Sequence, residues 1–361
     1  MMALVHSKDY EKHNTGTHPE NKERIRVIMD SLEKERILNF KEINNFYDEY
    51  PKLNGNIDVI KPEMASREDI LRVHQESYVD YLKTFCGSGG GYLDFDTVVS
   101  QESYKIAKLA AGGAITASKL VLDGYNYAYS LARPPGHHAT KEKAMGFCLF
   151  NNLAVAIEYL REFHGIKKFM IFDFDAHYGN GTAEIYLNDP NVLYISIHQD
   201  PRTIFPGSGF IEEIGNSEGE GYNINIPMPP GSTSEDYMYI LERLLEPVAH
   251  DFSAEFHFIE VGFDGHKDDP LSRLCLDDEF YPWIMSKMME ISNKMVLIFE
   301  GGYNLSALSR CNMKMINVLR NKIPIDYDEV YKNHIMELNV SDETKKIFKN
   351  IQDVFSSFYE F

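Results

Sequence analysis

The segment Asp173-Phe-Asp-Ala-His177 carries two carboxylates and an imidazole at alternating positions, directly after a hydrophobic run. If that run is a buried strand, alternation turns Asp173, Asp175 and His177 to one side at its end. Asp264 follows another such run. Carboxylate oxygens and imidazole nitrogens are ligands of zinc and of other divalent metals. Asp175, His177 and Asp264 together would leave a coordination position for water, so we predict a catalytic metal site.

Two adjacent histidines, His137 and His138, follow the stretch Arg133-Pro-Pro-Gly. The prolines stiffen the backbone there, and the glycine permits a tight turn. One imidazole can then act as a general base toward water while the other supports the opposite side of the reaction. Asp173 and Asn180 are the nearest candidates to fix the tautomers of the two rings. An aspartate would raise the basicity of its imidazole, whereas an asparagine would mainly orient it.

A tyrosine, Tyr303, follows Glu300-Gly-Gly at the end of the hydrophobic run 295–299. A phenol donates a hydrogen bond without carrying charge, which suits an oxyanion that develops opposite a metal ion. The two glycines allow the loop to come close to such a site. We therefore expect Tyr303 to take part in the chemistry rather than to pack in the core.

The elements that must position these residues are strands that alternate with helices. Runs rich in Ile, Val, Phe and Tyr occur at 126–132, 167–174, 191–197, 254–262 and 295–299. Helical patterns occur at 20–36, 102–122, 147–163, 235–249 and 280–293. This alternation predicts an α/β fold with a mainly parallel sheet covered on both faces. In such a fold, active-site residues gather at the carboxyl ends of the strands.

No repeat or composition break divides the chain, so we expect a single domain over residues 1–361, with a helical C-terminal segment from about 305. The Gly-rich stretch 86–92 predicts a flexible loop. Lys and Arg total 36 against 55 Asp and Glu, a net charge of −19 that disfavours binding to nucleic acid or to an anionic membrane. Four separated cysteines, without a signal peptide or an apolar membrane span, predict a soluble cytoplasmic protein.

Seven motifs along the chain resemble those of the histone deacetylase superfamily, in the family's order. They are His18-Pro-Glu-x-x-x-Arg24, Arg133-Pro-Pro-Gly-His-His-Ala139, Gly146-Phe-Cys-Leu-Phe-Asn151, Asp173-x-Asp-x-His-x-Gly-Asn-Gly-Thr182, Phe205-Pro-Gly-Ser-Gly209, Gly262-Phe-Asp264 and Glu300-Gly-Gly-Tyr303. The first and fourth are similar to the class II and bacterial branch, which includes acetylpolyamine amidohydrolases. The resemblance implies the three-layer, arginase-like α/β fold around a central, mainly parallel eight-stranded sheet.

The resemblance also implies roles for the residues above. The zinc ligands, which could hold iron(II) instead, are matched by Asp175, His177 and Asp264. The catalytic group consists of a histidine pair, its two supporting residues and a tyrosine that polarises the substrate carbonyl. It is matched by His137, His138, Asp173, Asn180 and Tyr303. Two structural potassium ions are implied as well, the inner one matched by Asp173, Asp175, His177, Ser196 and Ile197, the outer one by Tyr186, Asp189, Val192 and Tyr222.

A tunnel for an acyl-lysine side chain is also implied. Its aromatic walls, glycine lining and rim leucine are matched by Phe147, Phe205, Gly146, Gly301 and Leu271. The rim aspartate that holds the substrate backbone is matched by Asp94 or Asp96, and the arginine at the base of a product-exit channel by Arg24. Two positions depart from the family pattern. Tyr178 stands where most members have a second histidine, and Glu260 where they have a small residue.

The activity implied by the resemblance is zinc-dependent hydrolysis of an N-acyl amide, with an acyl-lysine side chain or a similar N-acyl amine as substrate and hydroxamates as inhibitors. Acetylpolyamine hydrolysis is the main alternative, although Leu271 stands where polyamine-selective relatives tend to have an acidic or constricting element. Arginase-like chemistry needs further carboxylates, and Gly179 occupies one of their positions. A non-catalytic relative would typically have lost a ligand, a histidine or the tyrosine, and this sequence keeps them all.

Overall fold

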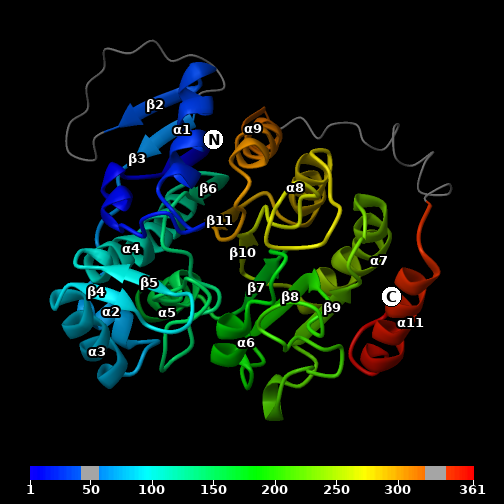
Figure 1. The fold of residues 1–361 in the computed structure, drawn as a ribbon. Coiled ribbons are helices and arrows are strands. Elements are labelled where there is room, and N and C mark those ends of the chain that lie inside the picture. The colour runs from blue at the N-terminus through cyan, green and yellow to red at the C-terminus, as the bar shows by residue number, and fades with distance from the viewer. Residues whose placement is uncertain (42–56, 322–338) are drawn as a thin grey trace.

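A central sheet of nine parallel strands crosses the molecule in the computed structural model, which describes residues 1–41, 57–321 and 339–361 (Figure 1). The strand order is β2-β3-β1-β6-β11-β10-β7-β8-β9. The strands are β1 (Met2–Val5), β2 (Leu38–Lys41), β3 (Ile57–Ile60), β6 (Tyr127–Ser130), β7 (Phe169–Asp173), β8 (Val192–Gln199), β9 (Asn223–Met228), β10 (Phe256–Val261) and β11 (Met295–Phe299). The predicted parallel α/β sheet is confirmed. The expected number of eight strands is wrong, because β2 pairs with β3 and adds a ninth strand at that edge.

Both faces of this sheet are buried, because side chains alternate along each strand and nearly all of them are apolar. In β7, Phe169 and Ile171 belong to the hydrophobic core on one face. Met170 and Phe172 belong to the core on the other face. The hydrophobic runs seen in the sequence are therefore strands that are covered on both sides rather than amphipathic edges.

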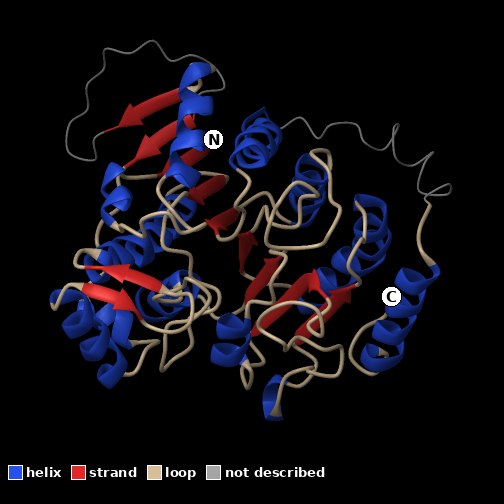
Figure 2. Cartoon of the chain, viewed as in Figure 1, coloured by secondary structure: helices blue, strands red, loops and turns tan. Residues whose placement is uncertain are grey.

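Helices form the two outer layers (Figure 2). One layer packs on the core that contains Met170, and consists of α1 (Glu23–Lys34), α7 (Ser234–Phe252), α8 (Phe280–Ile291), α9 (Leu305–Asn321) and α11 (Asp342–Phe355). The other packs on the core that contains Phe169, and consists of α2 (Arg67–Leu71), α3 (Glu76–Gly87), α4 (Ser103–Leu122), α5 (Asn152–His164) and α6 (Asn180–Tyr186). The three-layer arrangement follows from the alternation of strands and helices along the chain.

Helix α5 begins at Asn152, five residues later than the sequence pattern predicts. The preceding residues form a tight turn in which the backbones of Met145 and Cys148 bond each other at 3.2 and 3.0 Å. Phe147 takes a positive φ of 69°, which is incompatible with a helix. The Asn151 side chain then accepts the Ala154 N–H at 2.8 Å and caps the helix.

The Gly-rich stretch is not the flexible loop that the sequence predicted. Its end forms strand β4 (Gly90–Tyr92), which pairs antiparallel with β5 (Val98–Ser100). A Cβ atom on Gly90 would lie 2.3 Å from the Val99 carbonyl oxygen, so glycine is what permits this close pairing. The hairpin turn between the two strands carries Asp94 and Asp96.

The C-terminal part is helical where the structure describes it, in α9 and α11, while 322–338 lie outside the described residues. Ser341 caps α11 by accepting the Thr344 N–H at 3.0 Å. The Thr344 hydroxyl in turn donates to Asp236 of α7 at 2.8 Å. These bonds hold α11 against α7 at the sheet edge formed by β9.

Candidate active site

The segments that follow β7 and β10 bring Asp175, His177 and Asp264 together. His177 Nδ1 lies 3.2 Å from Asp175 Oδ1 and 2.9 Å from Asp264 Oδ2. Both aspartates are buried, and 13% of the His177 side chain is exposed. One donor atom from each residue therefore points at a common position that is reached from one side.

Glycines and backbone N–H groups make room for this cluster and orient it. A Cβ atom on Gly301 would lie 2.3 Å from Asp264 Oδ2 and 2.4 Å from Asp175 Oδ2, so any side chain there would displace both carboxylates. The remaining oxygens are fixed, because Asp175 Oδ2 accepts the Gly301 N–H at 2.7 Å and Asp264 Oδ1 accepts the Ala176 N–H at 2.9 Å. Within the described ranges, no Lys or Arg forms an ion pair with either aspartate.

The two buried carboxyl groups of this cluster favour a positive charge between them. Burial and the neighbouring charge of Asp175 raise the pKa of Asp264. Burial lowers the pKa of His177, but its bonds to Asp175 and Asp264 outweigh this effect and raise the pKa to about 10. The two carboxylates therefore stabilise positive charge at the His177 Nδ1 position. Two carboxylates and one imidazole are a donor set that suits a divalent zinc or iron ion, so the residues fit the expected metal.

His137 and His138 stand beside the cluster with their ring centroids 4.0 Å apart. His137 Nδ1 lies 3.1 Å from Asp173 Oδ2, and His138 Nδ1 lies 2.8 Å from Asn180 Oδ1. Asn180 is the first residue of α6, so the helix start fixes its side chain. Each imidazole thus uses Nδ1 for its supporting residue, and His137 Nε2 lies 3.9 Å from Asp175 Oδ1.

The different partners give the two rings different charges. Burial lowers the pKa of His137, but the negative charges of Asp175 and Asp173 outweigh it, and the pKa stands well above its usual range. Burial also lowers the pKa of His138, and the positive charges of His137 and His177 lower it further. The site therefore holds one charged imidazole next to a neutral one.

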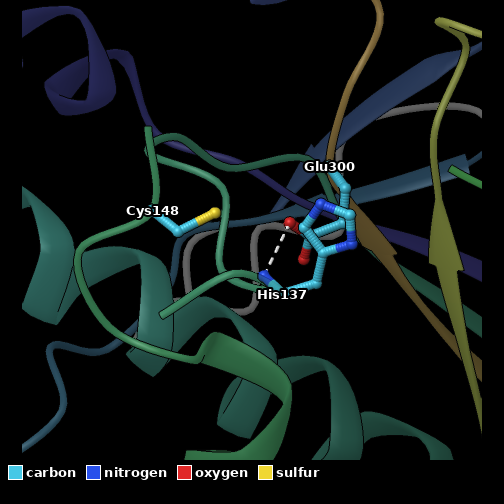
Figure 3. A group of neighbouring side chains, drawn as sticks. All are labelled: His137, Cys148 and Glu300. Atoms are coloured by element: carbon cyan, nitrogen blue, oxygen red, sulfur yellow. Dashed lines mark hydrogen bonds between the residues drawn. The ribbon is translucent and has the colours of Figure 1, made fainter. Parts of the chain in front are cut away.

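Glu300 fixes the backbone of the histidine turn (Figure 3). Its Oε2 accepts the Gly136 N–H at 2.7 Å and the His137 N–H at 3.1 Å. Because Glu300 also begins the loop that leads to Tyr303, one residue connects the histidine pair to the tyrosine. Burial raises the pKa of Glu300 to about 7. The sequence motif singled out this glutamate only as a neighbour of Tyr303.

Tyr194 is a site residue that the sequence did not indicate. Its hydroxyl donates to Asp173 Oδ2 at 2.7 Å, the same oxygen that His137 contacts. The Asp175 N–H binds the other oxygen at 2.9 Å. Tyr194 lies within β8, and aromatic residues are common in buried strands. The sequence around Tyr194 therefore did not predict its contact with Asp173.

Glu260, one of the two departures from the family pattern, lies next to Asp173 in the sheet. Its Oε1 accepts the Thr182 hydroxyl at 2.9 Å, and Thr182 also donates its N–H to the His137 carbonyl at 3.1 Å. Burial and the negative charge of Asp173 raise the pKa of Glu260 well above its usual range. A buried carboxyl group thus ties β10 to the start of α6. Tyr178, the other departure, packs its ring 4.9 Å from that of His198.

Tyr303 lies between the metal cluster and the N-terminal part of the chain. Its ring centroid is 5.8 Å from that of Phe147, and the Arg24 guanidinium lies 4.7 Å from the Tyr303 centroid. Arg24 is fully buried, and its Nε donates to the Gly302 carbonyl at 2.7 Å. The arginine predicted at an exit channel therefore lies against the backbone and the ring of the Tyr303 loop.

The other predicted substrate-binding residues lie around His138. The Phe205 ring is 4.9 Å from the His138 ring and is 41% exposed. Gly146 takes a positive φ, and a Cβ atom there would lie 2.4 Å from His138 Cδ2. Phe147 packs edge-on against the His18 ring at 4.5 Å. The partly exposed Phe205 ring thus packs on His138. The Phe147 ring packs instead on His18 and Tyr303.

The two candidate rim aspartates have different surroundings. Asp94 accepts the N–H groups of Asp96 at 3.0 Å and Thr97 at 2.6 Å, so it closes the hairpin turn. The Thr97 hydroxyl accepts the Phe147 N–H at 3.2 Å, which joins this turn to the site. Burial and the charge of Asp94 raise the pKa of Asp96, while His18 lowers it.

The residues predicted to hold potassium ions lie in β7, α6 and β8, and in the segments that follow β7, follow α6 and precede β9. Ser196 pairs in register with Asp173, and its hydroxyl lies 2.9 Å from His198 Nδ1. Ile197 follows in the same strand. Of the residues predicted for the outer ion, the Tyr222 carbonyl accepts the Tyr194 N–H at 2.9 Å, and the Asp189 carbonyl accepts the Val192 N–H at 3.2 Å. The Asp189 carboxylate pairs with Arg161 at 2.7 Å, and Tyr186 packs against α5.

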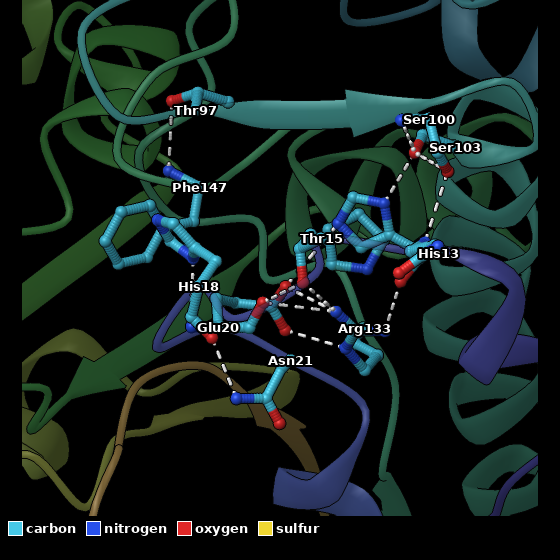
Figure 4. A network of polar contacts seen from close by, with 12 residues as sticks. His13, Thr15, His18, Glu20, Asn21, Thr97, Ser100, Ser103, Arg133 and Phe147 are labelled. Carbon is cyan, nitrogen blue, oxygen red and sulfur yellow. Dashed lines mark hydrogen bonds and ion pairs between the residues drawn. The ribbon is translucent and has the colours of Figure 1, made fainter. Parts of the chain in front are cut away.

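A buried ion-pair cluster consists of His13, Glu20, Arg24 and Arg133. Figure 4 shows His13, Glu20 and Arg133 of this cluster. Arg133 binds Glu20 with two nitrogens, at 2.8 and 2.7 Å. Arg24 binds the same carboxylate at 3.2 Å, and His13 approaches it at 3.5 Å. Arg133 precedes the histidine turn and Arg24 contacts the Tyr303 loop, so the cluster links these two loops.

The histone deacetylase domain family matches residues 18–319, and the chain belongs to this family. Its sequence is 41% identical to a protein named "Probable deacetylase" from Methanothermobacter thermautotrophicus, over all of both chains. It is 39% identical to the "Histone deacetylase-like amidohydrolase" of Pseudomonas aeruginosa, over 74% of this chain and 72% of that protein. The crystal structure of the HDA15 HD domain superposes with a TM-score of 0.86 and 29% identity, covering 99% of this chain and 95% of that one.

These similarities confirm the family predicted from the motifs, the α/β fold and the assignment as a hydrolase. The protein is a deacetylase or amidohydrolase of the histone deacetylase family, and this family is typically metal-dependent. None of the helices in the described ranges has the length and apolar composition needed to cross a membrane.

Proposed function

We propose that the protein is a zinc-dependent deacylase that removes an acetyl or similar acyl group from the side-chain amine of an acyl-lysine or from a related N-acyl amine. The convergence of Asp175, His177 and Asp264 beside a charged and a neutral histidine carries this proposal. Asp175, His177 and Asp264 would hold the ion, which iron(II) could replace. When bound, a divalent metal polarises the acyl carbonyl and makes water more acidic.

The residues of the chain divide the proton transfers between them. His138 is neutral and has Nε2 free, so it is the general base that takes a proton from the attacking water. Tyr303 donates a hydrogen bond from its hydroxyl to the oxygen that becomes negative. Burial raises the pKa of Tyr303 well above its usual range, so the phenol stays protonated and neutral. An imidazolium of the pair then protonates the departing amine, and the acid is released as carboxylate.

The tunnel residues define the substrate class. Phe147 and Phe205 are the walls for an aliphatic chain, with each buried methylene contributing about 0.8 kcal/mol. Gly146 and Gly301 line it, Leu271 stands at its rim, and Arg24 borders the exit. Because Asp94 is occupied in the hairpin turn, Asp96 is the aspartate that would bind the substrate backbone. We further propose that the inner and outer potassium sites are used, with the residues predicted from the sequence.

Acetylpolyamine hydrolysis remains the second candidate, because the two aspartates of the hairpin turn stand near Phe147 and would attract a cationic amine. The deciding experiment compares turnover of an acetyl-lysine peptide with turnover of acetylated putrescine and spermidine, using protein of known metal content. We expect about one divalent ion per chain, inhibition by a hydroxamate and faster turnover of the peptide. A Tyr303→Phe variant should keep its metal but lose about 10²–10³-fold in turnover, as when one oxyanion donor is removed. Protein that binds no divalent metal when one is supplied, or that carries one ion per chain yet hydrolyses none of these amides, would refute the proposal.

A further inference from the structure

Asp269 is a buried carboxylate that lies outside the motifs and bridges two loops of the site. It is 7% exposed. Its Oδ2 accepts the N–H groups of Tyr303 at 2.6 Å and of Asn304 at 3.0 Å. Its Oδ1 accepts the N–H of Leu271 at 3.0 Å. One side chain therefore binds the two backbone N–H groups that flank the Tyr303 Cα atom, and also the backbone N–H of the predicted rim residue Leu271.

These contacts differ from those of a helix cap. Helix α9 begins at Leu305, and the Asn304 side chain caps it by accepting the Ala307 N–H at 3.0 Å. Asp269 binds the N–H groups of Tyr303 and Asn304 instead, which precede the helix. In the part of the chain that the structure describes, no Lys or Arg pairs with Asp269. Its carboxylate is therefore oriented by backbone N–H groups alone.

The loop that carries Tyr303 needs hydrogen bonds that restrain its backbone, because two flexible glycines precede the tyrosine. Gly302 has a φ of 112°, a conformation that few other residues adopt, so this segment has more backbone freedom than its neighbours. Arg24 fixes it from one side by binding the Gly302 carbonyl at 2.7 Å. Asp269 fixes it from the other side by binding the next two N–H groups. Together the two contacts restrain the backbone that carries the Tyr303 side chain.

We infer that Asp269 is a positioning residue for Tyr303 and couples it to Leu271 at the rim of the substrate tunnel. The inference rests on the proposed deacylase function, in which the Tyr303 hydroxyl must meet the substrate oxygen. A displacement of about 1 Å in a catalytic group can cost about 10²-fold in rate. A substrate that presses on Leu271 would thereby be linked, through one carboxylate, to the placement of the catalytic phenol.

The experiment uses Asp269→Asn, which keeps the volume but replaces one accepting oxygen with an NH₂ group that faces a backbone N–H. We expect kcat for an acetyl-lysine peptide to fall about 10–100-fold, the range typical of residues that orient catalytic ligands, while KM changes less than 3-fold. Metal content and melting temperature should stay near wild type. Asp268→Asn is the matched control, because its half-exposed side chain contacts His266 and Arg310 and should leave kcat unchanged.

A double-mutant cycle separates positioning from general stability. In a Tyr303→Phe background, Asp269→Asn should reduce turnover less than 3-fold further, because the hydroxyl that it positions is already absent. An equal loss in both backgrounds, or wild-type kcat in Asp269→Asn, would overturn the inference. If Asp269→Asn does not fold, Asp269→Glu keeps the charge but moves it by one methylene, and the same cycle applies.

A readout without turnover distinguishes this inference from the proposed function. Amide hydrogen exchange in residues 300–305 should be faster in Asp269→Asn than in wild type and unchanged in Asp268→Asn. If the wild-type protein hydrolyses no acyl amine, the proposed function fails while the exchange data still test the hold on the loop. Unchanged exchange in Asp269→Asn would remove Asp269 as a positioning residue whatever the substrate.

Discussion

Two buried polar clusters of this protein, which lie close together, differ in how their charges balance. In the ion-pair cluster, Glu20 is surrounded by two arginines and a histidine, and its two oxygens are bonded. The acidic cluster consists of Asp173, Asp175, Glu260, Asp264 and Glu300, and among the described residues only histidines pair with its carboxylates. The Glu20 carboxylate of the first cluster therefore has its charged partners within the protein. The second, in the described part of the chain, brings carboxyl groups together with histidines alone as charged partners, which is an environment that a divalent cation would stabilise.

The largest expected effect comes from unbalancing the ion-pair cluster. Glu20→Gln would leave Arg24 and Arg133 buried without their carboxylate, so we expect it to lower the free energy of unfolding by about 3–5 kcal/mol. Chemical denaturation of the purified variant measures this loss. Glu23→Gln is the control, because Glu23 pairs with Arg26 at 2.7 Å on the surface, where such a pair contributes about 0–1 kcal/mol. Equal stability of the two variants would show that the buried pair does not support the fold.

A smaller effect is expected at a buried polar residue outside both clusters. His74 Nδ1 lies 2.9 Å from the Thr140 carbonyl, to which it donates, and Nε2 accepts the Asn151 N–H at 3.0 Å, so the ring is held neutral. Burial lowers the pKa of His74 to about 4, against 6.5 in the unfolded chain. Below pH 6.5 the unfolded chain takes up a proton that the folded protein cannot bind until about pH 4. His74 therefore costs stability as pH falls from 6.5 to 4, by up to about 3 kcal/mol in total.

A His74→Gln variant tests this pH dependence. Its free energy of unfolding should be lower than wild type at pH 7, but should fall less steeply between pH 6.5 and 4. His250→Gln should follow the wild-type curve, because the His250 side chain is 88% exposed. Parallel pH curves for wild type and His74→Gln would show that His74 does not stay neutral in the folded protein.

The sequence predicted five strands from hydrophobic runs, and missed β1, β2, β3 and β9. β6, β7, β8, β10 and β11 all coincide with predicted runs. β1 and β3 have only four residues each. β9 carries Asn223 and Asn225, which look solvent-exposed in the sequence. In the fold, both are buried and donate to backbone carbonyls of the segment before the strand, such as the Glu213 carbonyl. Such a partner cannot be read from local composition.

The same limit applies to the candidate site. The sequence indicates Asp175, His177, Asp264 and the histidine pair because these polar residues closely follow apolar runs. Tyr194 and Asp269 give no such signal, since the first resembles a core aromatic and the second a loop residue. Their importance lies in bonds to Asp173 and to backbone N–H groups far away in sequence. The sequence therefore indicated the groups that are proposed to carry the chemistry, whereas the groups that contact and orient them became visible only in the fold.

The smallest predicted change in stability is that of Asp264→Asn. It tests the difference between the two clusters most directly, because we expect it to stabilise the metal-free protein, whereas Glu20→Gln should destabilise the protein. In metal-free protein prepared with a chelator, Asp264→Asn removes a charge that Asp175 repels, while the asparagine oxygen can still accept the Ala176 N–H. We expect this variant to unfold at a higher temperature than metal-free wild type, with a gain on the order of 1 kcal/mol. Added zinc should raise the melting temperature of wild type and leave the variant nearly unchanged, since a ligand that binds only the folded state stabilises it. If Asp264→Asn instead destabilises the metal-free protein as Glu20→Gln does, then the acidic cluster is balanced without a cation, and the distinction between the two clusters fails.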